Sequence, residues 1–155
     1  MKRNVMIRLT VSEEGYIETV YELIKEHGYA AVTDIAAALN VKPPSATRMI
    51  QKLDAANFVK YTPYRTVTLT SKGEKLARAL EKRHNTLKKF LEMIGVDKNI
   101  AEQDACRIEH IAHKMTMEKL TEFVEFVQKA PRSPRWLQHF KYFKKTGKHP
   151  ECRDD

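Results

Sequence analysis

Two helical patterns joined by a tight turn, in the first third of the chain, restrict the possible folds most. The first pattern is alanine-rich and covers residues 32–39, with Thr33 as its expected cap, and a turn follows over residues 40–42. Pro43 marks the start of the second helix, because proline is tolerated in the first turn and fixes where a helix begins. The buried side of this second helix ends at Leu53. The pair predicts a helix-turn-helix, although an ordinary helical hairpin has a similar pattern.

A β-rich segment follows and favours the helix-turn-helix. Residues 58–70 contain two runs rich in β-branched and aromatic residues, on either side of a turn at residues 63–65. In the second run Val67 and Leu69 alternate with threonines, as they would in a strand with one buried face. A two-stranded wing is the usual companion of a helix-turn-helix. We therefore predict a winged helix-turn-helix domain over residues 1–75.

The rest of the chain is predicted to be helical. Its 155 residues include only five glycines, and amphipathic patterns occupy most of the sequence outside the wing. We expect five further helices, which run from Thr10 or Ser12 to Gly28, from Ser71 to Gly95, from Asp97 to about His113, from Thr116 to about Lys129, and from Arg135 to Lys145. The expected fold is mainly α, with an all-helical domain over residues 76–145 and a flexible tail over residues 146–155.

The helices after Gly73 carry more apolar and aromatic surface than they can bury among themselves. A winged helix also reads roughly palindromic DNA best as a two-fold dimer. The C-terminal half is therefore expected to form a homodimer.

The charge balance indicates a polyanionic partner. The formal net charge is +8, and residues 42–75 hold seven Lys or Arg against Asp54 and Glu74. Basic side chains contact the phosphates of double-stranded DNA, and hydrogen-bonding side chains near the start of a recognition helix reach base edges. The expected DNA-contacting residues are Lys42, Pro43, Pro44, Ser45, Thr47, Arg48, Gln51, Lys52, Lys60 and Arg65.

The sequence does not indicate secretion or a membrane location. Its apolar runs are shorter than a transmembrane segment, and charged residues interrupt the first eight positions too often for a signal peptide. We therefore expect a cytoplasmic protein without a membrane partner. In that compartment Cys106 and Cys152 favour thiol chemistry over a structural disulfide.

Residues 104–113 place potential metal donors on one face of a predicted helix. At 100° per residue, Cys106, Glu109 and His110 fall within about 100° of arc, and His113 lies between them. A thiol, a carboxylate and an imidazole at this spacing can converge on one transition-metal ion. The alternative is that Cys106 fills a core position and the other residues form a solvated face. The apolar stripe expected to be buried on the opposite side consists of Ala105, Ile108, Ile111, Ala112 and Met115.

These motifs resemble the metal-dependent repressors of the diphtheria toxin repressor and manganese transport regulator family. The resemblance covers roughly residues 16–129, and its most specific segments are Val32-Thr33-Asp34-Ile35-Ala36, Lys52-Leu53, Leu69-Thr70-Ser71-Lys72-Gly73, Arg83-His84, Phe90-Leu91, Ile94-Gly95-Val96 and Asp104-Ala105-Cys106-Arg107-Ile108-Glu109-His110. It implies a two-domain repressor that controls iron or manganese homeostasis. The metal ligands that it implies are Glu18, His84, Cys106, Glu109 and His110, and Glu14 and His113 are additional candidates.

Departures from the family pattern bear on the identity of the metal. Gly15 stands where the manganese regulators carry an aspartate, which leaves room for Glu14, water or a backbone carbonyl. Cys106 stands where they carry a glutamate, and a thiolate favours Fe(II), Co(II), Ni(II) or Zn(II) over Mn(II). Lys88 and Glu102 replace an acid and a histidine of the second site in the iron branch. The expected cofactor is Fe(II) or Mn(II), with Zn(II), Co(II) or Ni(II) as substitutes.

The predicted function is a transcriptional repressor that a divalent cation activates. Donors from three helical segments must meet around one ion, so the ion selects one orientation of the DNA-reading and dimerising halves. In a dimer, this orientation sets the spacing of two recognition helices on a palindromic operator. One alternative is a winged-helix regulator that senses Cys106 oxidation or a small organic ligand. Another is an enzyme built on the same cluster, but no nucleophile motif or phosphate loop supports it, and no organic substrate is expected.

Overall fold

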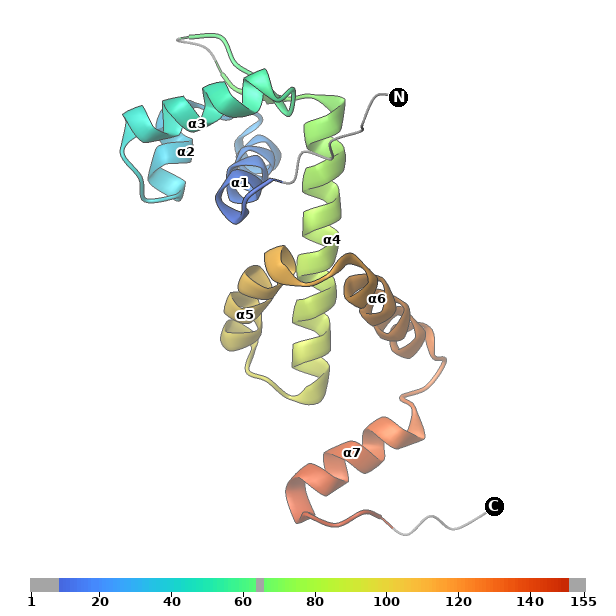
Figure 1. Ribbon diagram of the computed structural model, residues 1–155. Helices are drawn as coiled ribbons and strands as arrows, with labels where there is room; N and C mark the ends of the chain where they lie inside the picture. The colour runs from blue at the N-terminus through green and yellow to red at the C-terminus, as the bar shows by residue number, and fades with distance from the viewer. Residues whose placement is uncertain (1–8, 64–65, 151–155) are drawn as a thin grey trace. The chain divides into compact units, whose positions relative to one another are not determined.

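The computed structural model describes residues 9–63 and 66–150, which are predominantly helical (Figure 1). The elements are α1 (Val11–His27), α2 (Val32–Ala38), α3 (Pro43–Ala55), β1 (Val59–Lys60), β2 (Thr68–Leu69), α4 (Ser71–Ile94), α5 (Lys98–Ile111), α6 (Lys114–Lys129) and α7 (Arg135–Thr146). The chain divides into two compact units between Ala112 and His113. The first unit contains α1 to α5 with both strands. The predicted mainly α fold with a winged helix-turn-helix is confirmed.

Helix α1 begins and ends at residues that the sequence predicts. The Thr10 hydroxyl accepts a hydrogen bond from the Glu13 backbone N–H at 3.2 Å, and the Glu13 carboxylate accepts one from the Thr10 N–H at 2.7 Å. Gly28 ends the helix in the left-handed conformation at φ 81°, which glycine adopts without strain. The apolar face of α1 contributes Ile17 and Val20, both fully buried, to the core of the first unit.

Helices α2 and α3 form the predicted helix-turn-helix. Asn40 makes the turn between them at φ 51°, and Pro43 occupies the first turn of α3. The prediction that Thr33 caps α2 is wrong. The cap is Ala31, two residues earlier, and the helix begins at Val32, because the Ala31 carbonyl already accepts hydrogen bonds from the backbone N–H groups of residues 34 and 35.

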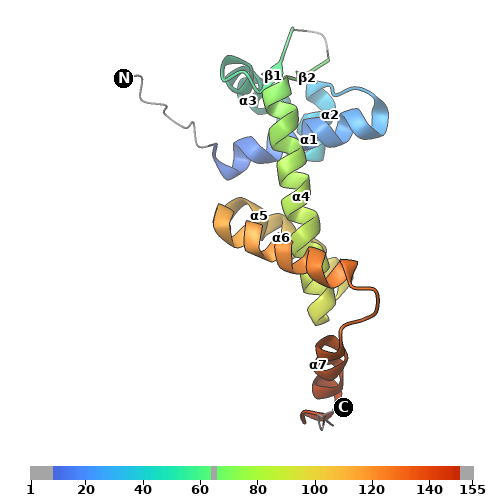
Figure 2. The same cartoon turned by 90° about the vertical axis from the view of Figure 1, so that its right-hand side faces the viewer.

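The wing is formed by the short strands β1 and β2 (Figure 2). They pair antiparallel, with Val59 opposite Leu69. An isolated bridge between Ala30 and Val67 continues this pairing towards α2, and both residues are fully buried. The wing is therefore anchored to the segment before α2 by the hydrogen bond that the Val67 N–H donates to the Ala30 carbonyl at 2.7 Å, as well as by apolar packing. The predicted phosphate contact at Arg65 lies outside the described residues.

The start of α4 is fixed by its contact with the wing. The cap is Thr70 rather than the expected Ser71, since the Thr70 hydroxyl accepts from the Gly73 N–H at 3.1 Å and donates to the Asn57 carbonyl at 2.7 Å. Gly73 is required here, because an added Cβ would lie only 2.0 Å from the Phe58 carbonyl oxygen.

Helices α4 and α5 form a hairpin. As predicted, α4 ends at Gly95 and Asp97 caps the start of α5. The expected apolar stripe of α5 is only partly correct. Ala105 is fully buried, but Ile111 is 75% exposed in the single chain, and the carboxylate of Glu109 is buried instead. The inward face of α5 is thus narrow and carries an ionisable carboxyl group, whereas the large apolar side chain of Ile111 is exposed in the single chain.

The second unit consists of the predicted helices α6 and α7, which are connected by residues 130–134. The rings of Phe123 on α6 and Trp136 on α7 lie 5.7 Å apart at their centroids. Other large apolar side chains of this unit stay exposed in the single chain, among them Phe126 at 65%. Among the described residues, no helix is both long and apolar enough to cross a membrane.

Candidate metal centre

Carboxylates and imidazoles from α1, α4 and α5 line one pocket of about 770 Å³ in the first unit. Each helix contributes polar side chains from the face that it turns towards the other two. The polar residues in this lining include Glu18, Glu22, His84, Lys88, Glu102, Cys106, Glu109 and His110. The chain therefore brings all five residues of the implied ligand set to the wall of the same pocket.

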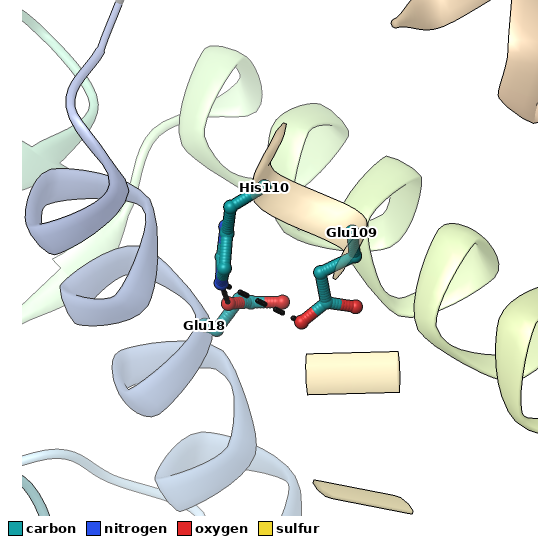
Figure 3. A group of neighbouring side chains, drawn as sticks. All are labelled: Glu18, Glu109 and His110. Atoms are coloured by element: carbon teal, nitrogen blue, oxygen red, sulfur yellow. Dashed lines mark ion pairs between the residues drawn. The ribbon is translucent and has the colours of Figure 1, made fainter. Parts of the chain in front are cut away.

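Three of these side chains converge most closely (Figure 3). One donor atom each from Glu18, Glu109 and His110 lies within 4.8 Å of the other two. The Nε2 atom of His110 is 3.4 Å from Glu18 Oε2 and 3.5 Å from Glu109 Oε1. Two carboxylates and one imidazole at these separations form a cluster that a single divalent cation can share.

The second ring nitrogen of His110 is held by Glu14. Glu14 Oε2 lies 2.8 Å from His110 Nδ1, and the imidazole is only 6% exposed. When Nδ1–H donates to this carboxylate, the lone pair of Nε2 is directed at Glu18 and Glu109. Sequence reasoning offers Glu14 as an additional ligand, and in the structure its carboxylate contacts Nδ1 of His110 rather than the Nε2 atom that faces Glu18 and Glu109.

His84 approaches the cluster from α4. Its Nδ1 atom is 3.3 Å from Glu109 Oε2, and its Nε2 atom is 2.8 Å from Glu102 Oε1. The ring is thus located between an inner and an outer carboxylate, as the His110 ring is. Sequence reasoning names Glu102 only as a departure from the family pattern and misses this contact, because it depends on the distance between α4 and α5.

Glu109 is the electrostatic centre of the cluster. Its side chain is 2% exposed, and Oε2 receives no hydrogen bond from the described part of the chain, although His84 lies nearby. Burial, and then repulsion from Glu18, Glu14 and Glu22, raises the pKa of Glu109 to about 8. A buried carboxylate without such a bond is costly, and a cation would compensate it. The donor set therefore fits a divalent metal ion.

Glu18 has a similar but smaller perturbation. Burial raises the pKa of Glu18 to about 7, while the neighbouring His110 opposes that increase. Two carboxylates that resist ionisation in the same pocket are characteristic of a functional site, because charge repulsion there has no structural benefit.

Cys106 and His113 do not join the closest cluster. Cys106 lines the pocket and is exposed overall, and the pKa of its thiol is raised chiefly by partial burial and then by Glu109 and Glu18. A raised pKa favours the neutral thiol over the thiolate that binds metals. His113 lies in the second unit, where its Nδ1 accepts a hydrogen bond from the Met115 N–H at 3.2 Å and caps α6.

Except for Arg65, the predicted DNA-contacting residues lie along α3, from Lys42 just before it to Lys52, and on β1. Of those in the described ranges, all are exposed except Thr47, which is partly buried and donates a hydrogen bond to the Pro43 carbonyl at 3.0 Å. Lys52 has an additional role, because its Nζ atom lies 2.8 Å from Glu13 Oε1 and links α3 to the capping box of α1. Sequence reasoning misses this ion pair.

Two family models match consecutive parts of the chain. The N-terminal DNA binding domain of iron dependent repressors matches residues 8–67, and their metal binding and dimerisation domain matches residues 70–137. The chain is also 46% identical to the HTH-type transcriptional regulator MntR of Lysinibacillus sphaericus, over 115 residues that make up 74% of this chain and 83% of that protein.

Solved structures show the same resemblance. The crystal structure of T. acidophilum IdeR is similar with a TM-score of 0.65 and 27% identity, over 76% of this chain and 55% of that one. The structure of the manganese regulator SloR is similar with a TM-score of 0.64 and 25% identity, over 74% of this chain and 54% of that one.

Proposed function

Because this chain belongs to the iron dependent repressor family and is a metal-dependent regulator that binds DNA as a homodimer, we propose that its activating ion binds among Glu18, Glu109, His110 and His84. The observation that carries this proposal is the buried Glu109 carboxylate, which faces two imidazoles and a second carboxylate and has a pKa near 8. A divalent cation supplies the positive charge that this site lacks.

The positions of the three helices that supply the ligands explain how metal binding affects the DNA-binding domain. Helix α1 packs in the core of the winged helix-turn-helix, whereas α4 and α5 form the hairpin that follows the wing. Glu18 lies on α1, His84 on α4, and Glu109 with His110 on α5. Side chains that share one ion restrict how these helices can move relative to one another, so metal binding favours one arrangement of the winged helix.

We infer that the activating metal is Mn(II) or Fe(II). The converging donors are carboxylate oxygens and imidazole nitrogens, which suit both ions, and the softer thiol of Cys106 stays outside this group. One similar protein is a manganese regulator by name. Zn(II), Co(II) and Ni(II) are expected to bind as substitutes, particularly where the Cys106 thiolate turns inward to join them.

The role that we propose is regulatory rather than catalytic. The family consists of transcriptional regulators, and in the cluster His84 is paired with Glu109 and His110 with Glu18. We further propose that the protein acts in the cytoplasm, and that residues 1–75 and 76–145 form its DNA-binding and metal-binding domains, with residues 146–155 as a tail. The proposed DNA contacts are the residues predicted from the sequence, which are Lys42, Pro43, Pro44, Ser45, Thr47, Arg48, Gln51, Lys52, Lys60 and Arg65.

Calorimetric titration of the metal-free protein with Mn(II) under anaerobic conditions tests the ligand set. Glu109→Ala and His84→Ala should each weaken Mn(II) binding by more than about 100-fold, since even outer partners of metal ligands contribute about 10- to 100-fold. The matched control is Glu74→Ala, which removes a carboxylate that pairs with Arg78 on α4 outside the pocket. Equal Mn(II) affinity in all four proteins would reject the proposed site.

A further inference from the structure

We propose that Glu102, anchored by Lys88, is a positioning residue that orients His84 towards the metal-binding cluster. The inference rests on the proposed function, because it takes His84 as a metal ligand. It assigns a role to two residues that the donor cluster itself does not include.

A continuous chain of contacts links Lys88 to the cluster. Lys88 Nζ lies 2.5 Å from Glu102 Oε2, and Glu102 Oε1 lies 2.8 Å from His84 Nε2. On its other side, His84 Nδ1 is 3.3 Å from the buried Glu109 Oε2. His84 and Lys88 are four residues apart on α4 and therefore share a face, while Glu102 reaches both of them from α5.

The chemistry of imidazole determines which nitrogen of His84 carries the proton in this series of contacts. A neutral ring has one N–H donor and one lone pair. When Nε2–H donates to Glu102, the lone pair stays on Nδ1 and faces Glu109, where the cation would bind. The His84 ring is 20% exposed, so without Glu102 it could turn towards solvent or protonate the inner nitrogen. Glu102 thus does for His84 what Glu14 does for His110.

Because of Lys88, the orienting effect of Glu102 on His84 can be distinguished from the attraction between the Glu102 charge and the metal ion. Its ammonium group neutralises the Glu102 carboxylate, so the pair contributes little net charge to the pocket. Glu102 is 50% exposed and Lys88 37% exposed, which means that neither residue is needed to fill the core. Their contribution to metal binding is therefore expected to come from the orientation of His84.

Mn(II) calorimetry with charge-matched variants tests this proposal. Glu102→Ala should weaken binding by about 10- to 100-fold, the usual cost of losing an outer partner of a metal-bound histidine. Glu22→Ala is the control, since Glu22 also lines the pocket and its removal changes the charge equally, without a hydrogen bond to His84 in the structure. It should weaken binding only a few-fold, and equal losses in the two variants would overturn the proposal.

Two further variants sharpen the result. Glu102→Gln keeps a carbonyl oxygen that can accept from His84 Nε2–H, so its Mn(II) affinity should stay within a few-fold of the wild type. Lys88→Met releases the anchor of Glu102 and should weaken Mn(II) binding, although it makes the pocket more negative. Tighter binding by Lys88→Met would show that charge alone governs the site and would overturn the proposal.

A spectroscopic measurement reports the orientation of His84 directly. In protein labelled with ¹⁵N-histidine and loaded with diamagnetic Zn(II), His84 should show a metal-bound Nδ1 and a protonated Nε2. Glu102→Ala should lose this pattern, and a metal-bound Nε2 in the wild type would contradict the proposal. The ligand assignment fails separately: unchanged affinity in His84→Ala rejects the proposed function, whereas unchanged affinity in Glu102→Ala alone rejects only the role of Glu102.

Discussion

At the scale of single residues, Glu109 shows how a functional site opposes stability. Its carboxylate is nearly inaccessible, faces other carboxylates and receives no hydrogen bond from the described residues through Oε2. A residue selected only for stability at this position would be apolar or neutral. The cost is explained if the carboxylate is retained to bind a cation.

Glu109→Gln should therefore stabilise the metal-free protein while it weakens Mn(II) binding. The folded state holds the Glu109 proton up to about pH 8, whereas the unfolded chain releases it near the ordinary value of 4.5. The folded state thus binds more protons between these values, so the free energy of unfolding falls as pH rises through this window. At pH 8 the variant should be more stable by about 1–3 kcal/mol, the cost of one unsatisfied buried polar group.

Urea unfolding of both metal-free proteins at pH 5 and pH 8 measures this effect. The wild type should lose more stability than Glu109→Gln between the two pH values. If the two proteins respond equally to pH, Glu109 is not the buried titrating group that we describe.

The sequence predicts part of this residue-scale arrangement. Helical spacing correctly places Glu109 and His110 on one face, and the family resemblance brings Glu18 and His84 to the same pocket. Which carboxylate is buried and which one holds the outer ring nitrogen depends on the distances between helices. For that reason the contacts of Glu14 with His110 and of Glu102 with His84 are seen only in the structure.

At the scale of elements, two helical glycines that look equivalent in the sequence have opposite environments. An added Cβ at Gly15 in α1 meets no atom within 4 Å, whereas at Gly73 in α4 it would lie 2.0 Å from a backbone carbonyl oxygen. The intrinsic preference for alanine over glycine in a helix applies to both positions, but steric overlap overrides it at the second.

Gly15→Ala should stabilise the metal-free protein by about 0.5–1 kcal/mol, because alanine loses less backbone entropy on folding. Gly73→Ala should destabilise it by about 1–3 kcal/mol, since α4 must shift away from the wing. Chemical denaturation of the two variants beside the wild type checks both signs. A stabilised Gly73→Ala variant would show that α4 does not pack against Phe58 as described.

Local and tertiary contacts also explain which helix ends the sequence predicts correctly. The ends at Thr10, Gly28, Gly95 and Asp97 are predicted correctly because each depends on hydrogen bonds within its own helix terminus. The cap of α4 is displaced to Thr70 because that hydroxyl also binds the loop before β1, a contact that no local pattern contains.

At the scale of the whole molecule, the order of domains is predictable because each domain has its own pattern of apolar and polar residues along the sequence. Two short helices, a wing and a helical segment identify the fold, and both family models match in the same order. The burial of α5 is not predictable from its own periodicity. Ile111 is exposed in the single chain, as expected for a chain whose second family model is a dimerisation domain.

We propose that one cation bound among α1, α4 and α5 controls DNA binding. The most direct test uses a fluorescent DNA duplex that is first selected from random sequences in the presence of Mn(II). The affinity of the protein for this duplex is then measured by anisotropy with Mn(II), with Fe(II) and after chelation. Metal should increase the affinity of the wild type by about 5- to 150-fold, the range of a typical coupling free energy, and Glu109→Ala should show no increase. Equal affinity of the wild type with and without either metal would contradict the account.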